Sequence, residues 1–288
     1  MQFHFSLTTI INFFIMYNVI QKKLMRTSTM EKSVTANDNS LQVIDRAFAV
    51  LEVMSGTRKM SLNELYTELK INKASLSRVL ASLCKNGYIS KDNETGSYSM
   101  TFKAFEIGIG ALRNTNYYYF VKEALRDLSK RFNVIAQFSV EDNNELLCLE
   151  SYNDNKNTFS VYTSVGVRSP LYATSAGKAI LSTYQTDEIF DKWEQMNIRP
   201  YTEHTITTPE KLLQEISQIR SQGYAVDKEE SELGLFCVGT VICNYNHQPI
   251  GAISVSTNEM SPERQDILGK AILEKSQYLN NLLGFSQV

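Results

Sequence analysis

The chain has few of the residues from which metal sites, disulfides and active sites are usually built. Its 288 residues include only four cysteines, three histidines and one tryptophan. The cysteines form no C-x-x-C pair and the histidines are far apart in the sequence, which disfavours a structural zinc site and a secreted disulfide scaffold. Scattered, reduced thiols are typical of the cytoplasm, where we expect the protein to reside.

Signatures of catalysis are also missing. The sequence contains no G-x-S-x-G, no H-E-x-x-H and no cysteine paired with a histidine. The segment ATSAGK at 173–178 is partly similar to a phosphate-binding loop, but Tyr172 replaces its first glycine and Ala179 replaces the serine or threonine after the lysine. We therefore predict that the protein is not an enzyme and has no catalytic residues, metal or cofactor.

Charge is unevenly distributed along a chain whose net charge is only −2. Residues 41–102 carry eight basic and six acidic side chains, whereas residues 117–288 carry 15 and 22. The length suits about two domains. The imbalance predicts a small DNA-binding module in front of a larger domain that does not bind nucleic acid.

An apolar run at residues 3–20 precedes the first predicted domain. No basic residue stands before it and no small-residue cleavage site follows it, so it does not match a signal peptide. It is near the minimum length for a membrane span and contains two threonines and two asparagines. We expect residues 1–40 to be a disordered or non-native extension, with translation starting at or near Met30, and no membrane contact. The alternative is a membrane-tethered small-molecule sensor anchored by residues 3–20.

Residues 41–102 contain the order of elements that characterises a winged helix-turn-helix. We predict helices at 41–54 and 62–69, the second opened by a Ser61/Glu64 capping box. A third helix follows the capping residue Asn72. Its apolar face consists of Leu76, Val79, Leu80 and Leu83. Predicted strands at 88–91 and 97–101 flank a turn rich in Asn, Asp and Gly, and this hairpin is the expected wing.

The opposite face of the third helix has serines and cations. Between Lys70 and Lys91 there are five basic residues and no acidic one. Such a helix suits the major groove of DNA, although an ordinary amphipathic surface helix has a similar pattern. The hairpin behind it favours DNA binding over a winged helix used only for protein contacts. The predicted DNA-binding residues are Lys73, Ala74, Ser75, Ser77, Arg78, Ser82, Lys85 and Lys91.

A helix at 102–113 is expected to connect two domains, within a linker assigned to residues 103–116. Phe102, Phe105, Ile109 and Leu112 are spaced for one buried face. Glycines at 108 and 110 weaken this helix in isolation, so it is a candidate contact between two copies of the chain.

The second domain, residues 117–288, mixes helices and strands without regular alternation. Helices are predicted at 117–132, 175–183, 187–196, 207–222 and 261–283, the fourth with a Thr207/Glu210 capping box. Strands are predicted at 134–140, 146–151, 159–163, 224–227, 235–243 and 250–257. The predicted fold class is therefore α+β, with a mostly antiparallel sheet.

Three segments of the second domain have a distinctive sequence. They are GVRSPLYATSAGKAIL at 166–181, IRSQGYAVDKEE at 219–230 and GAISVS at 251–256. Together with the winged helix, they resemble the IclR family of bacterial transcriptional regulators over residues 41–283. The resemblance implies an N-terminal winged helix-turn-helix, a linker helix used in dimer formation and a C-terminal GAF-like domain that binds a small effector.

The same resemblance implies the partners and the function. We expect a sequence-specific regulator that binds a double-stranded DNA operator as a homodimer or homotetramer, with repression favoured over activation. A small metabolite of the organic-acid or sugar-acid class is expected to modulate operator binding. The residues that the resemblance places around this effector are Ser175, Ala176, Asp227, Cys237, Ser254 and Ser256.

The chemistry of these residues suits a small polar ligand. Ser175 and Ala176 would begin a helix, whose free N–H groups favour a carboxylate. Ser254 and Ser256 are two apart on a strand and face the same side. Each serine alone could instead satisfy only the backbone. Asp227 would repel an acid, so a hydroxyl, an amine or a bridging water is its expected partner. Arg168 and Lys178 could supply positive charge near the ligand. Each could equally form an ion pair with one of three acidic residues, Glu229, Glu230 and Glu232.

Overall fold

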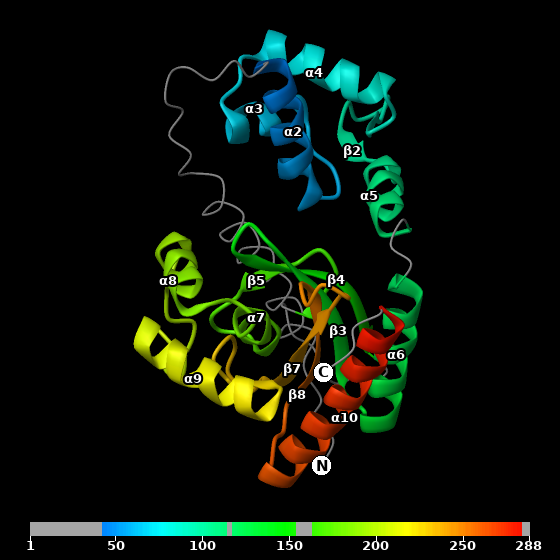
Figure 1. Ribbon diagram of the computed structural model, residues 1–288. Coiled ribbons are helices and arrows are strands. Elements are labelled where there is room, and N and C mark those ends of the chain that lie inside the picture. Colours follow the sequence, from blue (N-terminus) through cyan, green and yellow to red (C-terminus); the bar gives the residue numbers. More distant parts are fainter. Residues whose placement is uncertain (1–41, 114–116, 154–162, 284–288) are drawn as a thin grey trace, which may run out of the picture. The chain divides into compact units, whose positions relative to one another are not determined.

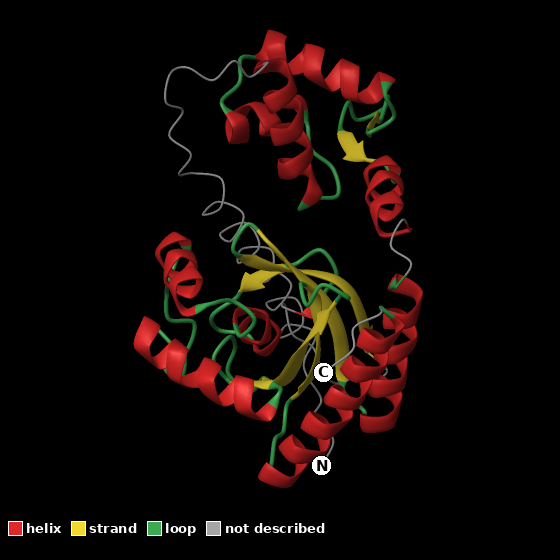
Figure 2. Cartoon of the chain, viewed as in Figure 1, coloured by secondary structure: helices red, strands yellow, loops and turns green. Residues whose placement is uncertain are grey.

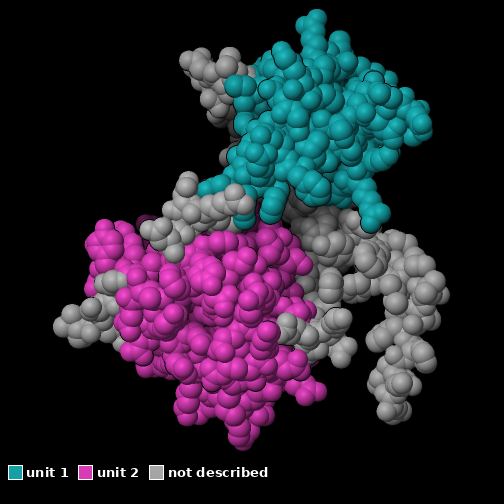
Figure 3. Space-filling view, turned by 90° about the vertical axis from the view of Figure 1, so that its right-hand side faces the viewer, with its two compact units in different colours: residues 1–114 teal, residues 115–288 magenta. Residues whose placement is uncertain are grey.

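The computed structural model describes residues 42–113, 117–153 and 163–283. The chain divides into two compact units, residues 1–114 and 115–288 (Figure 3). The predicted N-terminal extension, with its apolar run, lies outside the described residues. Among the helices that are described, none is long and apolar enough to cross a membrane.

The first unit consists of helices and one hairpin. Its described elements are α2 (Gln42–Ser55), α3 (Leu62–Leu69), α4 (Lys73–Lys85), β1 (Ile89–Lys91), β2 (Tyr98–Met100) and α5 (Lys103–Arg113) (Figure 1). β1 and β2 pair in antiparallel fashion. The predicted order of helices followed by a hairpin is confirmed, and it is that of a winged helix-turn-helix.

Side-chain caps determine where α3 and α4 begin. The Ser61 hydroxyl accepts the backbone N–H of Glu64 at 3.3 Å, and the Glu64 carboxylate accepts the N–H of Ser61 at 2.7 Å. Asn72 Oδ1 accepts the N–H of Ser75 at 2.8 Å. These bonds satisfy donors that have no partner within the first helical turn. Both predicted caps are confirmed.

The predicted apolar face of α4 forms part of the core of the first unit. Its four apolar residues are between 0% and 7% exposed. They pack with Val50, Met54 and Leu65 from the two preceding helices and with Ile89 and Tyr98 from the hairpin. Burying this face orients the serines and cations of α4 towards the surface.

The linker helix α5 does not bury the face that its apolar spacing predicts. Phe102, just before the helix, and Phe105 within it keep 89% and 66% of their surface exposed. The described part of this single chain leaves both rings largely uncovered. Their burial would need another surface.

A six-stranded antiparallel sheet forms the centre of the second unit. Its strand order is β5-β4-β3-β8-β7-β6. The strands are β3 (Ile135–Asp142), β4 (Glu145–Asn153), β5 (Arg168–Pro170), β6 (Ala225–Lys228), β7 (Phe236–Cys243) and β8 (Pro249–Thr257). The helices are α6 (Tyr118–Phe132), α7 (Ser175–Leu181), α8 (Thr186–Gln195), α9 (Pro209–Gln222) and α10 (Pro262–Leu282). The predicted α+β class is confirmed.

Helices cover both faces of this sheet (Figures 1 and 2). On one face, α6 and α10 bury Leu125, Leu128 and Ile272 against the strands. On the other face, α7 packs on β7 and β8, and α8 and α9 lie outside it. The sheet therefore separates two apolar cores, and α7 is the helix nearest to the strands on the second face.

The predictions for the second unit and the structure differ at three places. The strand predicted at 159–163 falls mostly outside the described residues, and Thr163, the one residue of it that is described, is not in a strand. β5 is not among the predicted strands, because three residues give no alternating pattern. The predicted Thr207/Glu210 capping box is wrong, because α9 begins one residue later, after Thr208, and has no side-chain cap. Pro209 opens this helix instead, and its missing N–H removes one donor that would need a partner.

Candidate functional site

Two glycines allow the start of α7 to pack closely on its surroundings. A Cβ at Gly177 would lie 2.3 Å from the carbonyl oxygen of Leu171. A Cβ at Gly239, on β7, would lie 2.8 Å from the backbone nitrogen of Ala176. Neither position has room for a side chain. Gly239 therefore allows the first turn of α7 to lie directly against β7, and Gly177 allows it to lie against the backbone of Leu171.

Thr174 fixes the direction of this first turn. Its hydroxyl donates to the carbonyl of Pro170 at 2.8 Å and accepts the N–H of Gly177 at 3.2 Å. No acceptor among the described residues takes the N–H groups of Ser175 and Ala176. These two donors are available to a ligand.

All six predicted effector residues line one cavity in the second unit. It lies between the start of α7, the strands and the turn after β6, and its volume is about 30 Å³. Its other lining residues are Gln137, Ser139, Leu146, Thr163, Ser169, Thr174, Ser231 and Leu235. The structure therefore brings together residues from three distant segments of the sequence, with eight hydroxyl groups around one small space.

The register of the sheet places three of the predicted residues in one row. Asp227 on β6 is opposite Cys237 on β7, which is opposite Ser256 on β8. In the adjacent row, Ser254 is opposite Gln137 on β3. Residues opposite each other on neighbouring strands share a face. The same face thus presents a carboxyl, a thiol, two hydroxyls and an amide to the cavity.

Asp227 is fully buried and both of its oxygens are engaged. Oδ1 accepts the backbone N–H of Glu230 at 2.7 Å, and Oδ2 accepts the hydroxyl of Ser231 at 2.7 Å. Burial is the largest influence on this group and raises the pKa of Asp227 to about 7. Near neutral pH the carboxyl is therefore partly protonated, which reduces the repulsion expected between Asp227 and an acidic ligand.

Cys237 is a buried hydrogen-bonding group. Its Sγ lies 3.2 Å from Ser256 Oγ. Burial raises the pKa of the Cys237 thiol well above its usual value, and the neighbouring Asp227 adds to this shift. A thiol that stays protonated is a poor nucleophile. Its place in the lining suits ligand contact rather than covalent chemistry.

Neither nearby cation lines the cavity. Lys178 forms ion pairs with Glu230 and Glu215. The pair with Glu230 is one of the alternatives predicted from the sequence. Arg168 pairs with Asp142 and, at 3.6 Å, with Glu145, so the predicted pairing with residues 229–232 is wrong for this arginine. Among the described lining residues there is no lysine or arginine. Hydroxyls and backbone N–H groups would have to hold an acidic ligand here.

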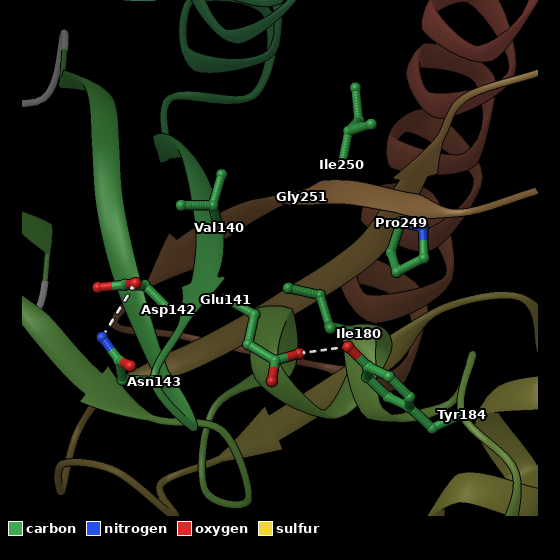
Figure 4. A pocket seen from close by; sticks show the side chains of 9 residues that line it. All are labelled: Val140, Glu141, Asp142, Asn143, Ile180, Tyr184, Pro249, Ile250 and Gly251. Carbon is green, nitrogen blue, oxygen red and sulfur yellow. Dashed lines mark hydrogen bonds between the residues drawn. The ribbon is translucent and has the colours of Figure 1, made fainter. Parts of the chain in front are cut away.

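A second, wider cavity lies at the far end of β3 and contains none of the predicted residues. Its volume is about 320 Å³, and Glu141, Ile180, Tyr184 and Gly251 are among the residues that line it (Figure 4). The Glu141 carboxylate accepts the Tyr184 hydroxyl at 2.8 Å and also pairs with Lys192. The Tyr184 hydroxyl is the single side-chain hydroxyl among its described lining residues, whereas eight line the smaller cavity. The smaller cavity is therefore the better candidate for a polar ligand.

Most of the residues predicted to bind DNA form one exposed surface of α4. The exposed members on this helix are Lys73, Ala74, Ser77, Arg78, Ser82 and Lys85, and Lys91 is exposed on β1. Arg78 and Lys85 have no acidic partner among the described residues. Two cations lie over aromatic rings, Lys73 over Tyr66 and Lys91 over Tyr98.

Ser75 differs from the other predicted DNA-binding residues. It is half-buried, and its hydroxyl accepts a hydrogen bond from Arg46 Nη1 at 2.6 Å. Arg46, on α2, is not among the predicted residues, because a single arginine in a helix gives no sign of its contact with another element. This bond leaves Ser77 as the freer of the two serines for a base contact.

Two family models match the chain. One, described as the IclR helix-turn-helix domain, matches residues 43–93, and the other, described as the C-terminal domain of the bacterial transcriptional regulator IclR, matches residues 109–279. The chain belongs to the IclR family. Members of this family are DNA-binding transcriptional regulators, and the predicted resemblance is confirmed.

Similar proteins cover most of the chain. The transcriptional regulator KdgR of Escherichia coli is 29% identical over 228 residues, which are 78% of this chain and 86% of that protein. The acetate operon repressor of Salmonella typhimurium is 24% identical over 242 residues, 82% of this chain and 88% of that protein. The crystal structure of Thermotoga maritima IclR, at 24% identity, has a TM-score of 0.73 and covers 85% of this chain and all of that one.

Proposed function

We propose that this chain is a transcriptional repressor whose binding to its operator is modulated by a small organic or sugar acid. The observation that carries the proposal is the convergence of Ser175, Asp227 and Ser256, with the other three predicted residues, on one small cavity. These residues come from separate parts of the chain. A serine that served only the local backbone would have no reason to meet the others there.

The lining chemistry supports a hydroxylated or oxo acid. The lining can donate to a carboxylate and to further oxygens through two N–H groups and through hydroxyls such as those of Ser175 and Ser254, since the hydroxyls of Thr174 and Ser231 already donate within the protein. A partly protonated Asp227 can donate or accept. A similar protein of Salmonella typhimurium is named as the repressor of an acetate operon, and acetate is an organic acid. An uncharged apolar ligand would leave these hydroxyls without partners, which disfavours it.

The size of the cavity supports a conformational response. A space of about 30 Å³ has room for about two water molecules. An acid of several carbons would enter only if the start of α7 and the turn after β6 move apart. A ligand that binds only the opened arrangement shifts the population towards it, and any difference in operator affinity between the two arrangements then becomes a response.

The DNA contact is assigned to α4 and the β1–β2 hairpin. Arg78 and Lys85 lie on the exposed face of α4 without acidic partners among the described residues, where they can meet phosphates. Ser77, exposed on the same helix, would contact a base edge in the major groove. A homodimer or homotetramer, with the exposed Phe102 and Phe105 at a contact between copies, would present two such helices to a symmetric operator. Light scattering should give two or four times the chain mass of 32.8 kDa.

A combined binding and stability screen tests the proposal. Fluorescence anisotropy of the full chain on DNA from upstream of its own gene should show tighter binding than on an unrelated fragment of equal length. Small organic and sugar acids are then screened by thermal shift, because a ligand that binds only the folded state raises the unfolding temperature. An acid that raises it should also change operator affinity. Equal affinity for both DNA fragments would contradict the proposed regulator.

A further inference from the structure

Lys178 is a fully buried cation beside the cavity. Its side chain has 0% of its surface exposed, and its ammonium lies 2.5 Å from Glu230 Oε1 and 3.2 Å from Glu215 Oε1. Lysine is almost never fully buried unless it is paired. Neither Lys178 nor Glu230 lines the cavity. The pair therefore needs an explanation other than direct contact with a ligand.

The pair joins two opposite parts of the cavity lining. Lys178 lies on α7, whose first residues, Ser175 and Ala176, line the cavity on one side. Glu230 lies in the turn after β6, and its backbone N–H donates to Asp227 Oδ1 at 2.7 Å. A single ion pair thus connects the helix that offers the free N–H groups to the turn that orients the buried carboxyl.

The turn is held on its other side by a buried threonine. Thr205 Oγ1 donates to the carbonyl of Glu230 at 2.6 Å. The second carboxylate oxygen of Glu230, Oε2, is buried and has no hydrogen-bond partner among the described residues. An ion pair with an unsatisfied oxygen is a poor way to gain stability, because burial of both charges costs much of what their attraction supplies. The position of the Lys178–Glu230 pair, between α7 and the turn, explains its presence better than a gain in stability does.

We propose that Lys178 and Glu230 are positioning residues, whose ion pair holds the Asp227 turn against α7 and so sets how far the cavity is closed. The inference rests on the proposed function, because it assumes that this cavity is the effector site. Loss of the pair frees the turn to move away from α7. The cavity then opens more often, and its preference for a smaller acid over a larger one weakens.

The buried thiol of Cys237 allows the opening to be measured without any effector. The full chain is alkylated with iodoacetamide, and labelling of each cysteine is followed by mass spectrometry of its peptide. In Lys178→Met, which keeps most of the aliphatic side chain, Cys237 should react at least about tenfold faster than in the unmodified chain. Cys243, buried on the same strand but outside the cavity, should keep its rate. An unchanged Cys237 rate, or an equal rise at both cysteines, would overturn the proposal.

A second ion pair of the same unit provides a matched control. Lys192 pairs with Glu141 and is also largely buried, but it lies beside the wider cavity. Lys192→Met removes the same charge and should leave Cys237 labelling unchanged. If Lys192→Met accelerates Cys237 as much as Lys178→Met does, the effect is a general loss of rigidity and the positioning role fails.

Glu230→Gln tests the other partner and serves if Lys178→Met does not fold. The amide retains the volume and the backbone N–H to Asp227 but weakens the bond to Lys178, so a smaller acceleration of Cys237 is expected. The double variant should label no faster than the stronger single variant, because both changes remove one interaction. Additive accelerations would contradict action through a common pair.

Size selectivity separates positioning from stability. Pyruvate and gluconate serve as a small and a larger acid, and fluorescence anisotropy measures how much of each changes operator binding by half. Lys178→Met should shift the ratio of their half-maximal concentrations towards gluconate, while Lys192→Met should not; an unchanged ratio would overturn the proposed role in size selection. If neither acid affects the unmodified chain, the proposed response to these acids fails, and the labelling result still decides whether the pair holds the turn.

Discussion

The Ser231 hydroxyl donates to Asp227 Oδ2 at 2.7 Å, four residues away and inside the second unit. The bond closes a turn whose two ends both line the cavity. The backbone N–H of Glu230 binds the other carboxylate oxygen. Asp227 therefore organises the local backbone as well as facing a ligand, and these two roles can be separated by substitution.

The buried Asp227 should make the second unit less stable as the pH rises. Its pKa of about 7 in the folded chain exceeds the ordinary value of 3.8, so the folded state binds the proton more tightly. The contribution to stability is therefore complete below about pH 4 and is lost as the pH rises to about 7. From pH 5 to pH 7 the loss is about 2 kcal/mol. Urea unfolding followed by Trp193, the only tryptophan and a residue of α8, measures it.

Asp227→Asn isolates this contribution from those of the groups around it. Lys178, Glu230, Glu232 and Cys237 also interact electrostatically with this buried region. Asparagine can still accept the N–H of Glu230, so the turn should form while the titration at position 227 is removed. The stability loss from pH 5 to pH 7 should shrink by about 2 kcal/mol. A variant with the same pH dependence as the unmodified chain would show that Asp227 is ionised throughout this range.

Local sequence patterns predict much of this fold because each depends on neighbouring residues. The Ser61/Glu64 box and the Asn72 cap involve residues three apart, and the apolar face of α4 repeats every three or four residues. The predicted cavity residues follow instead from the family resemblance. The alternation of Ser254 and Ser256 indicates a shared face but not what lies opposite them.

The remaining features depend on contacts between distant segments, which no local pattern contains. The row that joins Asp227, Cys237 and Ser256 follows from strand register. The bond from Arg46 to Ser75 and the pairing of Lys178 with Glu215 both join different helices. Several acids are available to Lys178 in the sequence, and only the packing of α7 against α9 and the turn selects among them.

Ser256→Ala should weaken the effector response and leave DNA binding intact. The substitution removes a hydroxyl that faces the cavity and bonds Cys237. Loss of one hydrogen bond to a charged ligand corresponds to about a tenfold rise in the half-maximal effector concentration. The half-maximal concentration is measured by fluorescence anisotropy of operator DNA while an acid identified by the thermal-shift screen is added.

Ser276→Ala is the control for this substitution. Ser276 is also buried, but it lies on α10 and donates to the carbonyl of Val241 at 2.7 Å, outside the cavity. Ser276→Ala should lower the stability of the second unit. The half-maximal effector concentration should stay the same when equal amounts of folded protein are compared. If both variants respond like the unmodified chain, Ser256 does not contact the effector.

Arg78→Ala should weaken binding to every DNA sequence. Arg78 is exposed on α4 without an acidic partner among the described residues, so its charge is free to replace a counterion at a phosphate. The slope of log affinity against log salt should fall in magnitude by about one. Arg131→Ala, an exposed arginine of the second unit, makes the same change in net charge and should leave the slope unaltered. Equal slopes for all three proteins would place the DNA contact elsewhere.

Gly177→Ala should strongly destabilise the second unit. The added Cβ would lie 2.3 Å from the Leu171 carbonyl oxygen, and a contact with backbone cannot be relieved by a side-chain rotation. Overpacking of this kind costs about 1–3 kcal/mol or more, and here it also pushes the start of α7 away from the cavity.

Gly108→Ala is the matched change, because a Cβ at that position on α5 would have no described atom within 4 Å and alanine favours a helix. The unfolding transition of Trp193 should move to lower urea concentration in Gly177→Ala and stay in place in Gly108→Ala. A Gly177→Ala transition equal to that of the unmodified chain would mean that α7 does not pack this closely on the preceding segment.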